Sequence, residues 1–443
     1  MKYMSKRNLY VGLATLLIIT SISASANIRS SIDAFPSYNN GLAQKPLLGW
    51  SSWSFLRQDP TETRLMAQAD ALFQTLQAHG YTYINLDDFW YLNPSTTVDN
   101  YGRWAVDTSR FPDGIIGTAA YVHSLGLKFG IYVTPGIPVA AVKQNTSIEG
   151  TSYHARDIAD TSEYETNYNF GSHTMYAIDY SKPGAEAYIQ SWANLFASWG
   201  VDFVKIDGVG EQDAGDIQAW SNALRRSGRP IYLQLSNMLD INDANMWRQY
   251  ANGWRTSDDI ECYCTTLTDW SDVATRFTTT PQWAQWAGKG GWNDLDSLDV
   301  GNGLKDGLTD AERQTYMTLW AISAAPLYSG DDLTQLDSYG ISLLTNDAVI
   351  AVDQAGIAAT PLSTNTEQQI WRAHEADGSY IVALFNLGAH PAKVTVNWSD
   401  LGISGAVTVT DLWSHTSQNT FSASFSATLA SHASRLLKVV PTT

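Results

Sequence analysis

Three strand-like segments of the sequence each run directly into aspartate residues. They are Phe203–Ile206 before Asp207, Tyr83–Leu86 before Asp87 and Asp88, and Trp254–Ser257 before Asp258 and Asp259. In a parallel β/α barrel the C-terminal ends of the strands meet at one rim, which carries the chemistry. Cleavage of a glycosidic bond needs two carboxyl groups, one facing the anomeric carbon and one protonating the leaving oxygen. The repeated pattern therefore indicates a barrel with glycoside chemistry at its rim.

Asp207 is the predicted nucleophile, because it ends a strand whose residues are typical of a buried position. Lys205 lies two residues earlier and projects from the same side of the strand, where its charge can keep Asp207 ionised and bind a sugar hydroxyl. A single strand-end aspartate is more often a cap or an ion-pair partner. The recurrence of such aspartates within one barrel favours the catalytic interpretation.

The second carboxyl group is harder to assign from chemistry alone, since Asp258 and Asp259 are adjacent and point in alternate directions. Arg255 stands four residues before Asp259, so a helical turn after the strand would bring these two side chains together. In that arrangement Arg255 would hold the sugar near the acid.

Strand-like runs alternate with helical patterns from residue 46 to about residue 350, which is typical of βα units around a parallel sheet. The predicted strands are Leu47–Trp50, Tyr83–Leu86, Leu127–Val133, Phe203–Ile206, Ile231–Leu235, Gly253–Arg255, Trp292–Asp294 and Pro326–Ser329. The predicted helices include Glu62–His79, Ala185–Trp199, Asp213–Ser227 and Asp310–Ala324. This pattern predicts an α/β fold, a (β/α)8 TIM barrel over residues 46–350. The segment 134–176 is long for a βα loop, so we expect it to form a wall of the pocket.

Residues 351–443 change character to short alternating or β-rich runs separated by Gly, Ser, Asn and His. The runs are Gln369–Arg372, Tyr380–Asn386, Ala392–Trp398, Ala406–Asp411 and Arg435–Val440. This pattern predicts a C-terminal antiparallel β-sandwich domain.

Residues 1–26 have the pattern of a secretory signal peptide: basic residues precede an apolar run from Leu9 to Ile22, and Ala24–Ala26 forms a cleavage site. Residues 27–45 are interpreted as a leader into the fold. No other apolar stretch of the sequence is long enough to span a bilayer. We therefore expect an exported protein, secreted or periplasmic, that is not held in a membrane once the signal is removed.

The charge of the chain narrows the class of partner. A formal net charge of -17 and a pI near 4.7 argue against nucleic acid or an anionic membrane. A neutral oligo- or polysaccharide is compatible with this charge. The 17 Trp and 22 Tyr suit the apolar faces of sugar rings, although barrel and β-sheet cores also use many aromatic residues.

The two cysteines of the sequence, Cys262 and Cys264, are separated by one residue. At this spacing a mutual disulfide is predicted to be geometrically unfavourable, and two thiols alone make a poor metal site. We expect them to be structural or incidental residues beside the site.

Several motifs follow one another in order over residues 46–440. They are Leu48–Trp53, Tyr83–Trp90, Gly126–Tyr132, Lys205–Gly208, Trp254–Ile260, Gly291–Asp296 and Met317–Trp320 leading to Ala325–Leu327. In this order they resemble glycoside hydrolase family 27, the group of α-galactosidases and α-N-acetylgalactosaminidases. The resemblance implies a barrel followed by an antiparallel domain, and it implies no metal and no organic cofactor.

The resemblance also implies a retaining mechanism in which Asp207 is the nucleophile and Asp259 the acid/base. The positions that match the family's substrate contacts are Trp53 as ring platform, Asp87 and Asp88 on the 6- and 4-hydroxyls, Tyr132, Lys205, Arg255 and Asp294.

Ser236 marks a departure from the galactose-specific pattern, in which a Glu after the fifth strand contacts the 2-hydroxyl. A small residue there resembles the members that accept N-acetylgalactosamine, whereas Leu239 does not fit their small-residue pattern. The sequence predicts a retaining exo-α-galactosidase. It leaves open α-N-acetylgalactosaminides, β-L-arabinopyranosides or α-1,6-glucans as substrates, and a non-catalytic carbohydrate-binding protein on the same scaffold.

Overall fold

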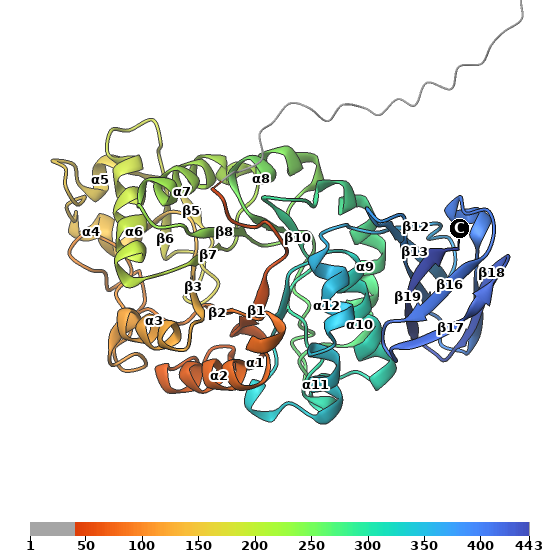
Figure 1. Cartoon of the computed structure of the whole chain (residues 1–443). Coiled ribbons are helices and arrows are strands. Elements are labelled where there is room, and N and C mark those ends of the chain that lie inside the picture. Colours follow the sequence, from red (N-terminus) through yellow and green to blue (C-terminus); the bar gives the residue numbers. More distant parts are fainter. Residues whose placement is uncertain (1–39, 443) are drawn as a thin grey trace, which may run out of the picture. The chain divides into compact units, whose positions relative to one another are not determined.

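The computed structural model describes residues 40–442 of the chain (Figure 1). The predicted signal peptide, residues 1–26, and the leader up to residue 39 lie outside the described residues. Among the residues that are described, no helix has the length and apolar character needed to cross a membrane.

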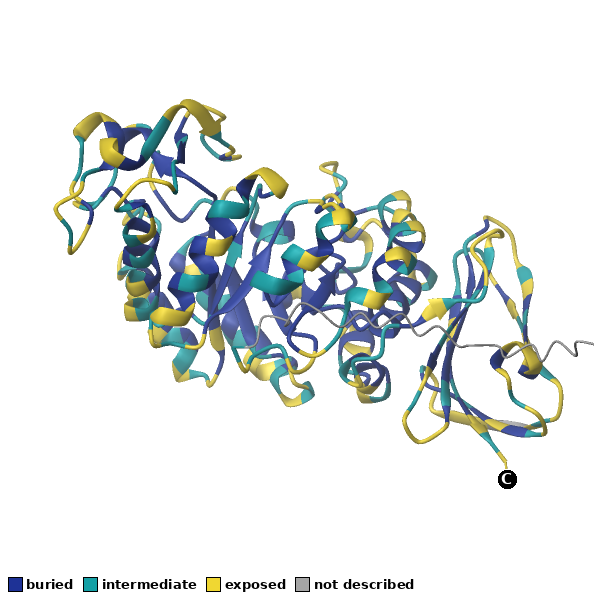
Figure 2. Ribbon diagram, turned by 90° about the horizontal axis from the view of Figure 1, so that it is seen from above, coloured by how far each residue is buried: buried dark blue, intermediate teal, exposed yellow. Residues whose placement is uncertain are grey.

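Eight parallel strands form one curled sheet with helices on its outside (Figures 1 and 2). They are β1 (Leu48–Ser51), β2 (Tyr83–Leu86), β3 (Lys128–Val133), β7 (Phe203–Ile206), β8 (Tyr232–Leu235), β9 (Gly253–Arg255), β10 (Trp292–Asp294) and β11 (Leu327–Ser329). Neighbours in the sheet run β10-β9-β8-β7-β3-β2-β1-β11. Leu298, just after β10, forms a parallel bridge with Ser329 of β11 and so brings the two ends of the sheet together. The predicted barrel is confirmed.

Twelve α-helices lie in the described part of the chain. They are α1 (Trp53–Leu56), α2 (Glu62–Thr75), α3 (Gly114–Ser124), α4 (Val139–Gln144), α5 (Ala155–Ile158), α6 (Ala185–Trp199), α7 (Ala214–Arg226), α8 (Ala244–Tyr250), α9 (Trp270–Trp283), α10 (Asp310–Ile322), α11 (Ser338–Leu344) and α12 (Asp347–Gln354). Helix α10 begins where a capping box predicts it: the Thr309 hydroxyl accepts from the Glu312 N–H, and the Glu312 carboxylate accepts from the Thr309 N–H at 2.7 Å.

Two glycines of the barrel strands make room for polar side chains in the interior. A Cβ on Gly130 of β3 would lie 2.1 Å from the Asn85 side-chain oxygen, and one on Gly253 of β9 would lie 2.0 Å from that of Gln234. Any larger residue at either position would displace these amides. The barrel interior is therefore shaped to hold polar groups beneath its rim.

The segment predicted to be a long loop, residues 134–176, folds into a small unit of its own between β3 and α6. Its three antiparallel strands are β4 (Ile137–Pro138), β5 (Ala159–Glu165) and β6 (Met175–Ile178), in the order β4-β6-β5. The connection from β5 to β6 carries Tyr168, which lines the cavity described below. The expectation that this segment forms part of the pocket wall is confirmed.

The C-terminal part of the chain is an antiparallel β domain, as predicted. One sheet has the order β12 (Thr360–Pro361), β13 (Gln368–His374), β14 (Tyr380–Asn386), β19 (Ser434–Pro441), β16 (Val407–Asp411) and β17 (Thr416–Phe421), and the other pairs β15 (Ala392–Asn397) with β18 (Ser424–Leu429). Apolar side chains of both sheets, including Val382 and Val396, share a core of their own. Strands β17 and β18 were not predicted, because their many Ser and Thr residues obscure the alternation of apolar side chains, and neither was the two-residue strand β12.

Candidate active site

A cavity of about 240 Å³ lies at the C-terminal ends of the barrel strands. It is lined by Trp53, Gln58, Asp87, Asp88, Phe89, Tyr132, Tyr168, Lys205, Asp207, Asn237, Asp259 and Tyr263. Both predicted catalytic aspartates, Asp207 and Asp259, are in this set. Five predicted substrate contacts are there too: Trp53, Asp87, Asp88, Tyr132 and Lys205. The structure thus brings most of the predicted site residues to one cavity, which we call the outer cavity.

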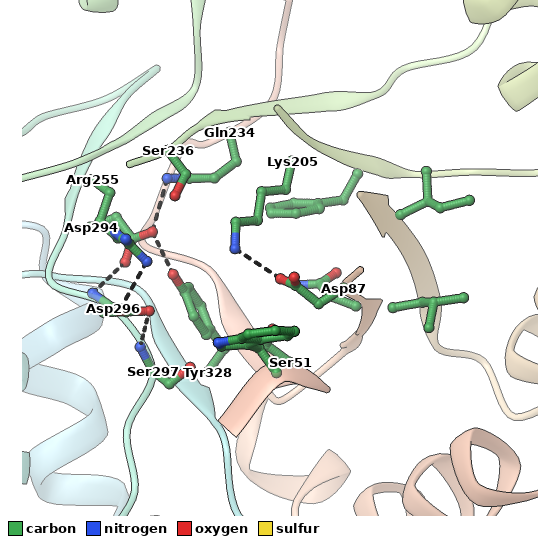
Figure 3. Close-up of a pocket in the computed structure, with 15 residues that line it drawn as sticks. Ser51, Asp87, Lys205, Gln234, Ser236, Arg255, Asp294, Asp296, Ser297 and Tyr328 are labelled. Carbon is green, nitrogen blue, oxygen red and sulfur yellow. Dashed lines mark hydrogen bonds and ion pairs between the residues drawn. The ribbon is translucent and has the colours of Figure 1, made fainter. Parts of the chain in front are cut away.

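The other three predicted contacts, Ser236, Arg255 and Asp294, line a second and smaller cavity instead (Figure 3). Its volume of about 20 Å³ gives room for roughly one water molecule. Trp53, Asp87 and Lys205 line both cavities, so the small one adjoins the outer cavity and lies toward the barrel interior. From the loop after β8, it is Asn237 rather than Ser236 that lines the outer cavity.

Lys205 connects the predicted nucleophile with the acids of β2. Its ammonium group lies 2.8 Å from the Asp87 carboxylate (Figure 3), and Asp207 is a further charged neighbour. Burial alone would lower the pKa of Lys205, but the negative charges of Asp87 and Asp207 outweigh it and raise the pKa. Lys205 is therefore a permanent cation at the base of the outer cavity, and its direct partner is Asp87.

The adjacent acids Asp258 and Asp259 face different surroundings. The Asp258 side chain is 72% exposed and pairs with Arg276 at 3.0 Å, whereas the Asp259 side chain is 29% exposed and lines the outer cavity. Arg255 binds one carboxylate oxygen of Asp259 as predicted, although the residues after β9 form no helical turn. The structure thus shows that Asp259, and not Asp258, lines the cavity, a choice that the spacing in the sequence left open.

Both oxygens of Asp259 are engaged. Arg255 binds Oδ1, and the hydroxyl of Tyr263 donates to Oδ2. Burial would raise the pKa of Asp259, but the charge of Arg255 and the hydrogen bond from Tyr263 together hold that pKa below its usual value.

Arg255 is almost fully buried and organises the acids around it. It pairs with Asp296 at 2.9 Å (Figure 3). It also pairs with Asp259 and donates to the Asn237 side chain at 2.6 Å. The ligand oxygens of Asp259, Glu261 and Asp296 lie within 4.8 Å of one another, a spacing that could suit a cation. Since two of these three acids already bind Arg255, the guanidinium supplies positive charge at this place.

Asp88 and the Tyr132 hydroxyl are the groups of the outer cavity best placed to bind sugar hydroxyls. Burial raises the pKa of Asp88 to about 7, so near neutral pH its carboxyl group can either donate or accept a hydrogen bond. The Tyr132 hydroxyl is buried and has no hydrogen-bond partner within residues 40–442. Buried polar groups are normally paired, so a ligand hydroxyl is a natural partner for it.

Five residues of the outer cavity were not predicted from the sequence. They are Gln58, Phe89, Tyr168, Asn237 and Tyr263. Phe89 directly follows Asp88 and stacks on Trp53 with ring centroids 6.2 Å apart. Tyr168 belongs to the long segment after β3, whose length was a usable signal. The position of Tyr263 between two cysteines was the only signal for that residue.

Cys262 and Cys264 form a disulfide bond, which corrects the prediction that pairing is unfavourable at this spacing. The intervening Tyr263 has φ +48°, in the left-handed region, and the two Cα atoms lie 5.2 Å apart. This distance is within the usual range for a disulfide. The prediction was wrong because one intervening residue is enough for the two cysteines to approach within bonding distance.

Buried carboxyl groups near the site predict that the protein loses stability as the pH rises. Burial, with the negative charge of Asp331, raises the pKa of Asp306 to about 9, and burial also raises the pKa of Asp331 and Asp299. Between the unfolded value near 4 and the folded value near 9, the folded protein holds more protons than the unfolded chain, so the free energy of unfolding falls with increasing pH. One such group contributes at most about 1.4 kcal/mol per pH unit.

We therefore expect the thermal midpoint at constant ionic strength to be several degrees lower near pH 8.5 than near pH 5.5, estimated from this linkage. Asp306→Asn, which is neutral at every pH, should flatten this dependence, while exposed Asp113→Asn should leave it unchanged. Differential scanning calorimetry measures both. A thermal midpoint that stays constant or rises between pH 5.5 and pH 8.5 would contradict the raised pKa values of Asp299, Asp306 and Asp331.

Two family models match the chain. The model described as alpha galactosidase A matches residues 57–162 and 167–355, and the model described as alpha galactosidase C-terminal beta sandwich domain matches residues 365–439. The first match spans most of the barrel, and the second lies within the C-terminal β domain.

Similar proteins match over nearly the whole chain. An α-galactosidase of Oryza sativa subsp. japonica is 30% identical over 438 residues, which are 97% of this chain and 92% of the relative. The structure of a family 27 β-L-arabinopyranosidase from Geobacillus stearothermophilus is 33% identical with a TM-score of 0.83, covering 90% of this chain and 97% of that one. α-Galactosidase I from Mortierella vinacea is 27% identical with a TM-score of 0.73, covering 91% and 99%.

Proposed function

The chain belongs to glycoside hydrolase family 27, the α-galactosidase family, and on that premise we propose that it is an exported, retaining exo-α-galactosidase. Its substrate would be an oligo- or polysaccharide with a terminal α-linked galactose. The observation that carries the proposal is that Asp207 and Asp259 line one cavity together with Asp87, Asp88 and other predicted substrate contacts. At about 240 Å³ the cavity is smaller than the roughly 300–1,000 Å³ typical of small-molecule sites, which suits a single sugar ring.

The first step breaks the glycosidic bond. A carboxylate oxygen of Asp207 attacks the anomeric carbon, and the bond from that carbon to the leaving oxygen breaks as Asp259, protonated in the substrate complex, transfers its proton to this oxygen. The product is a covalent glycosyl-enzyme. Lys205 and Arg255 offset the concentration of negative charge around the two aspartates.

The second step releases the sugar. Asp259, now a carboxylate, takes a proton from water, and the water oxygen attacks the anomeric carbon. The bond between that carbon and Asp207 breaks at the same time. Two inversions at one carbon give retention, which requires carboxyl groups about 5–5.5 Å apart rather than about 6.5–9.5 Å. Proton NMR of the first-formed sugar tests this step, since an inverting enzyme would release the opposite anomer.

The substrate is tested with nitrophenyl glycosides that differ at one position of the ring. The panel comprises the α-galactoside, the α-N-acetylgalactosaminide, the β-L-arabinopyranoside and the α-glucoside. We expect the highest kcat/KM for the α-galactoside. Binding of galactose without cleavage of any member would instead support a carbohydrate-binding protein on this scaffold.

A β-L-arabinopyranosidase is the second candidate, because a structure of that activity is among the most similar. β-L-Arabinopyranose has the ring stereochemistry of α-galactose but lacks its 6-hydroxymethyl group. Asp87 is the residue that we propose binds the 6-hydroxyl, so its replacement separates the two substrates. Its contact with Lys205 holds the carboxyl group in place at the cavity, where it can bind a 6-hydroxyl.

We expect Asp87→Ala to lower the ratio of kcat/KM for the α-galactoside over the β-L-arabinopyranoside by about 10- to 100-fold, the loss of one hydrogen bond to a charged group. The ratio cancels any effect on Lys205 that both substrates share. Asp88→Ala is the matched control: it should lower both values and leave the ratio unchanged, since both sugars carry the axial 4-hydroxyl. An unchanged ratio in Asp87→Ala would remove Asp87 from the recognition of the 6-position.

Export is the remaining part of the proposal, and it is supported by the signal-peptide pattern of residues 1–26 and by the Cys262–Cys264 disulfide, since disulfides persist in oxidising compartments. Expression of the full chain should place the protein outside the cytoplasm with an N-terminus at Asn27. Mass spectrometry of the purified protein reads this terminus. An intact Met1 on cytoplasmic protein would reject export.

A further inference from the structure

We propose that Tyr263, held between the disulfide-bonded Cys262 and Cys264, is the platform for the leaving group of the substrate, a sugar ring next to the glycosidic bond. The inference deepens the proposed function, because it concerns the part of the substrate beyond the first sugar.

Tyr263 stands at the mouth of the outer cavity beside the predicted acid/base. It lines that cavity, it remains 60% exposed, and its hydroxyl donates to Asp259 Oδ2. Asp259 must protonate the leaving oxygen, so the group attached to this oxygen leaves the cavity past Asp259. Tyr263 is therefore next to the path that the leaving group occupies.

The ring of Tyr263 is supported on one face. The Arg57 guanidinium lies 4.6 Å from the ring centroid, and Trp53 donates its indole N–H to the Tyr263 hydroxyl at 3.1 Å. The high exposure of Tyr263 means that much of the ring is still open to solvent. An aromatic face with a polar tip suits the apolar C–H face of a sugar.

The disulfide explains how a residue in a loop can serve as a fixed platform. Tyr263 lies in the connection between β9 and α9, outside any helix or strand, and it has φ +48°. The bond between Cys262 and Cys264 closes the chain on both sides of it. A side chain that is ordered before binding loses less conformational entropy when the ligand arrives.

The hydrogen bond to Asp259 couples the platform to the chemistry. Arg255 is buried and holds Oδ1, whereas Oδ2 is bound by the exposed Tyr263. Oδ2 is thus the oxygen that the leaving group can reach, beside the Tyr263 hydroxyl. Tyr168, which is 55% exposed and lies on a different loop, adds a second aromatic ring at this mouth.

The test compares the binding of a monosaccharide with that of its α-1,6-linked disaccharide by calorimetry. The sugar is the one that the nitrophenyl panel selects, or galactose if none is cleaved, and the protein is the full chain carrying Asp207→Asn to prevent turnover. We expect the disaccharide to bind about tenfold more tightly, the scale of one aromatic contact. Adding Tyr263→Ala should remove this gain, so that the disaccharide binds no more tightly than the monosaccharide, while Tyr263→Phe should keep most of the gain.

The matched control is Tyr164→Ala, which removes an exposed tyrosine that does not line the outer cavity. It should keep the full gain. If Tyr263→Ala still binds the disaccharide more tightly than the monosaccharide, or loses affinity equally for both sugars, Tyr263 is not the platform. Failure of the proposed function is a separate result, since it appears as an absence of cleavage by the wild-type protein while the binding comparison still gives its answer.

Kinetic measurements distinguish a leaving-group platform from a merely structural role of Tyr263. A glycosyl fluoride has a leaving group of one atom, so Tyr263→Ala should lower kcat/KM for the disaccharide about tenfold more than for the fluoride. Tyr263→Phe should move the alkaline limb of the kcat/KM profile to higher pH, because it removes a hydrogen bond that lowers the pKa of Asp259. Equal losses on both substrates would contradict the inference.

Discussion

Asp207→Asn is expected to reduce kcat by about 10⁴-fold or more, on the scale of losses seen when a catalytic nucleophile is replaced. The amide cannot form the covalent intermediate, and it also removes the negative charge opposite the developing oxocarbenium ion. Asparagine has nearly the same shape as aspartate, so the fold should be retained. Single-turnover kinetics with a nitrophenyl glycoside measures the loss, and circular dichroism with thermal unfolding checks the structure.

Two comparisons make this result specific. Asp258→Asn replaces an exposed aspartate close in sequence to the predicted acid/base, and it should leave kcat nearly unchanged. Asp207→Gly with added azide should regain turnover of an activated aryl substrate and yield the glycosyl azide of inverted configuration, because azide attacks in the place of the missing carboxylate. Appreciable activity of Asp207→Asn without any rescue would reject the assignment.

The barrel could be predicted because each of its strands is marked by a local pattern in the sequence. Four strands have the predicted bounds, among them β2 and β7, and the other four differ by one residue at one or both ends. A short apolar run bounded by polar residues marks a buried strand whatever its neighbours are. The strand ends that carry Asp207 and the pair Asp87-Asp88 follow from the same signal, which is why these residues were found without knowledge of the fold.

Residues on loops were less accessible to the same reasoning. Ser236 and Asn237 are adjacent, but Ser236 lines the small cavity of about 20 Å³ and Asn237 lines the outer cavity. That distinction depends on backbone torsions after the strand, which the residue types do not encode. Tyr263 was missed for the same reason, since its position depends on a φ of +48° and on a disulfide judged unfavourable. Similarly, only the length of the segment after β3 was informative, not its antiparallel sheet.

Asp259→Ala is expected to lose activity in proportion to how much the leaving group needs a proton. For a disaccharide, kcat/KM should fall by about 10²–10⁴-fold, the range of general acid catalysis. For a dinitrophenyl glycoside or a glycosyl fluoride, whose leaving groups depart without protonation, the first step should be nearly unaffected. The glycosyl-enzyme then accumulates because no base activates water, so a burst of product followed by slow turnover is the expected time course.

Azide separates the roles of the two aspartates. In Asp259→Ala it needs no general base and attacks the glycosyl-enzyme formed with Asp207, so it should accelerate turnover and give the azide of retained configuration. In Asp207→Gly it attacks the substrate directly and should give the opposite anomer. The same anomer from both variants, or equal losses for good and poor leaving groups in Asp259→Ala, would contradict the division of labour between a nucleophile at 207 and an acid/base at 259. Both side chains line one cavity, so products of opposite configuration would show that the two carboxyl groups have different roles. Asp207 bonds to the anomeric carbon, whereas Asp259 exchanges protons with the leaving oxygen and with water.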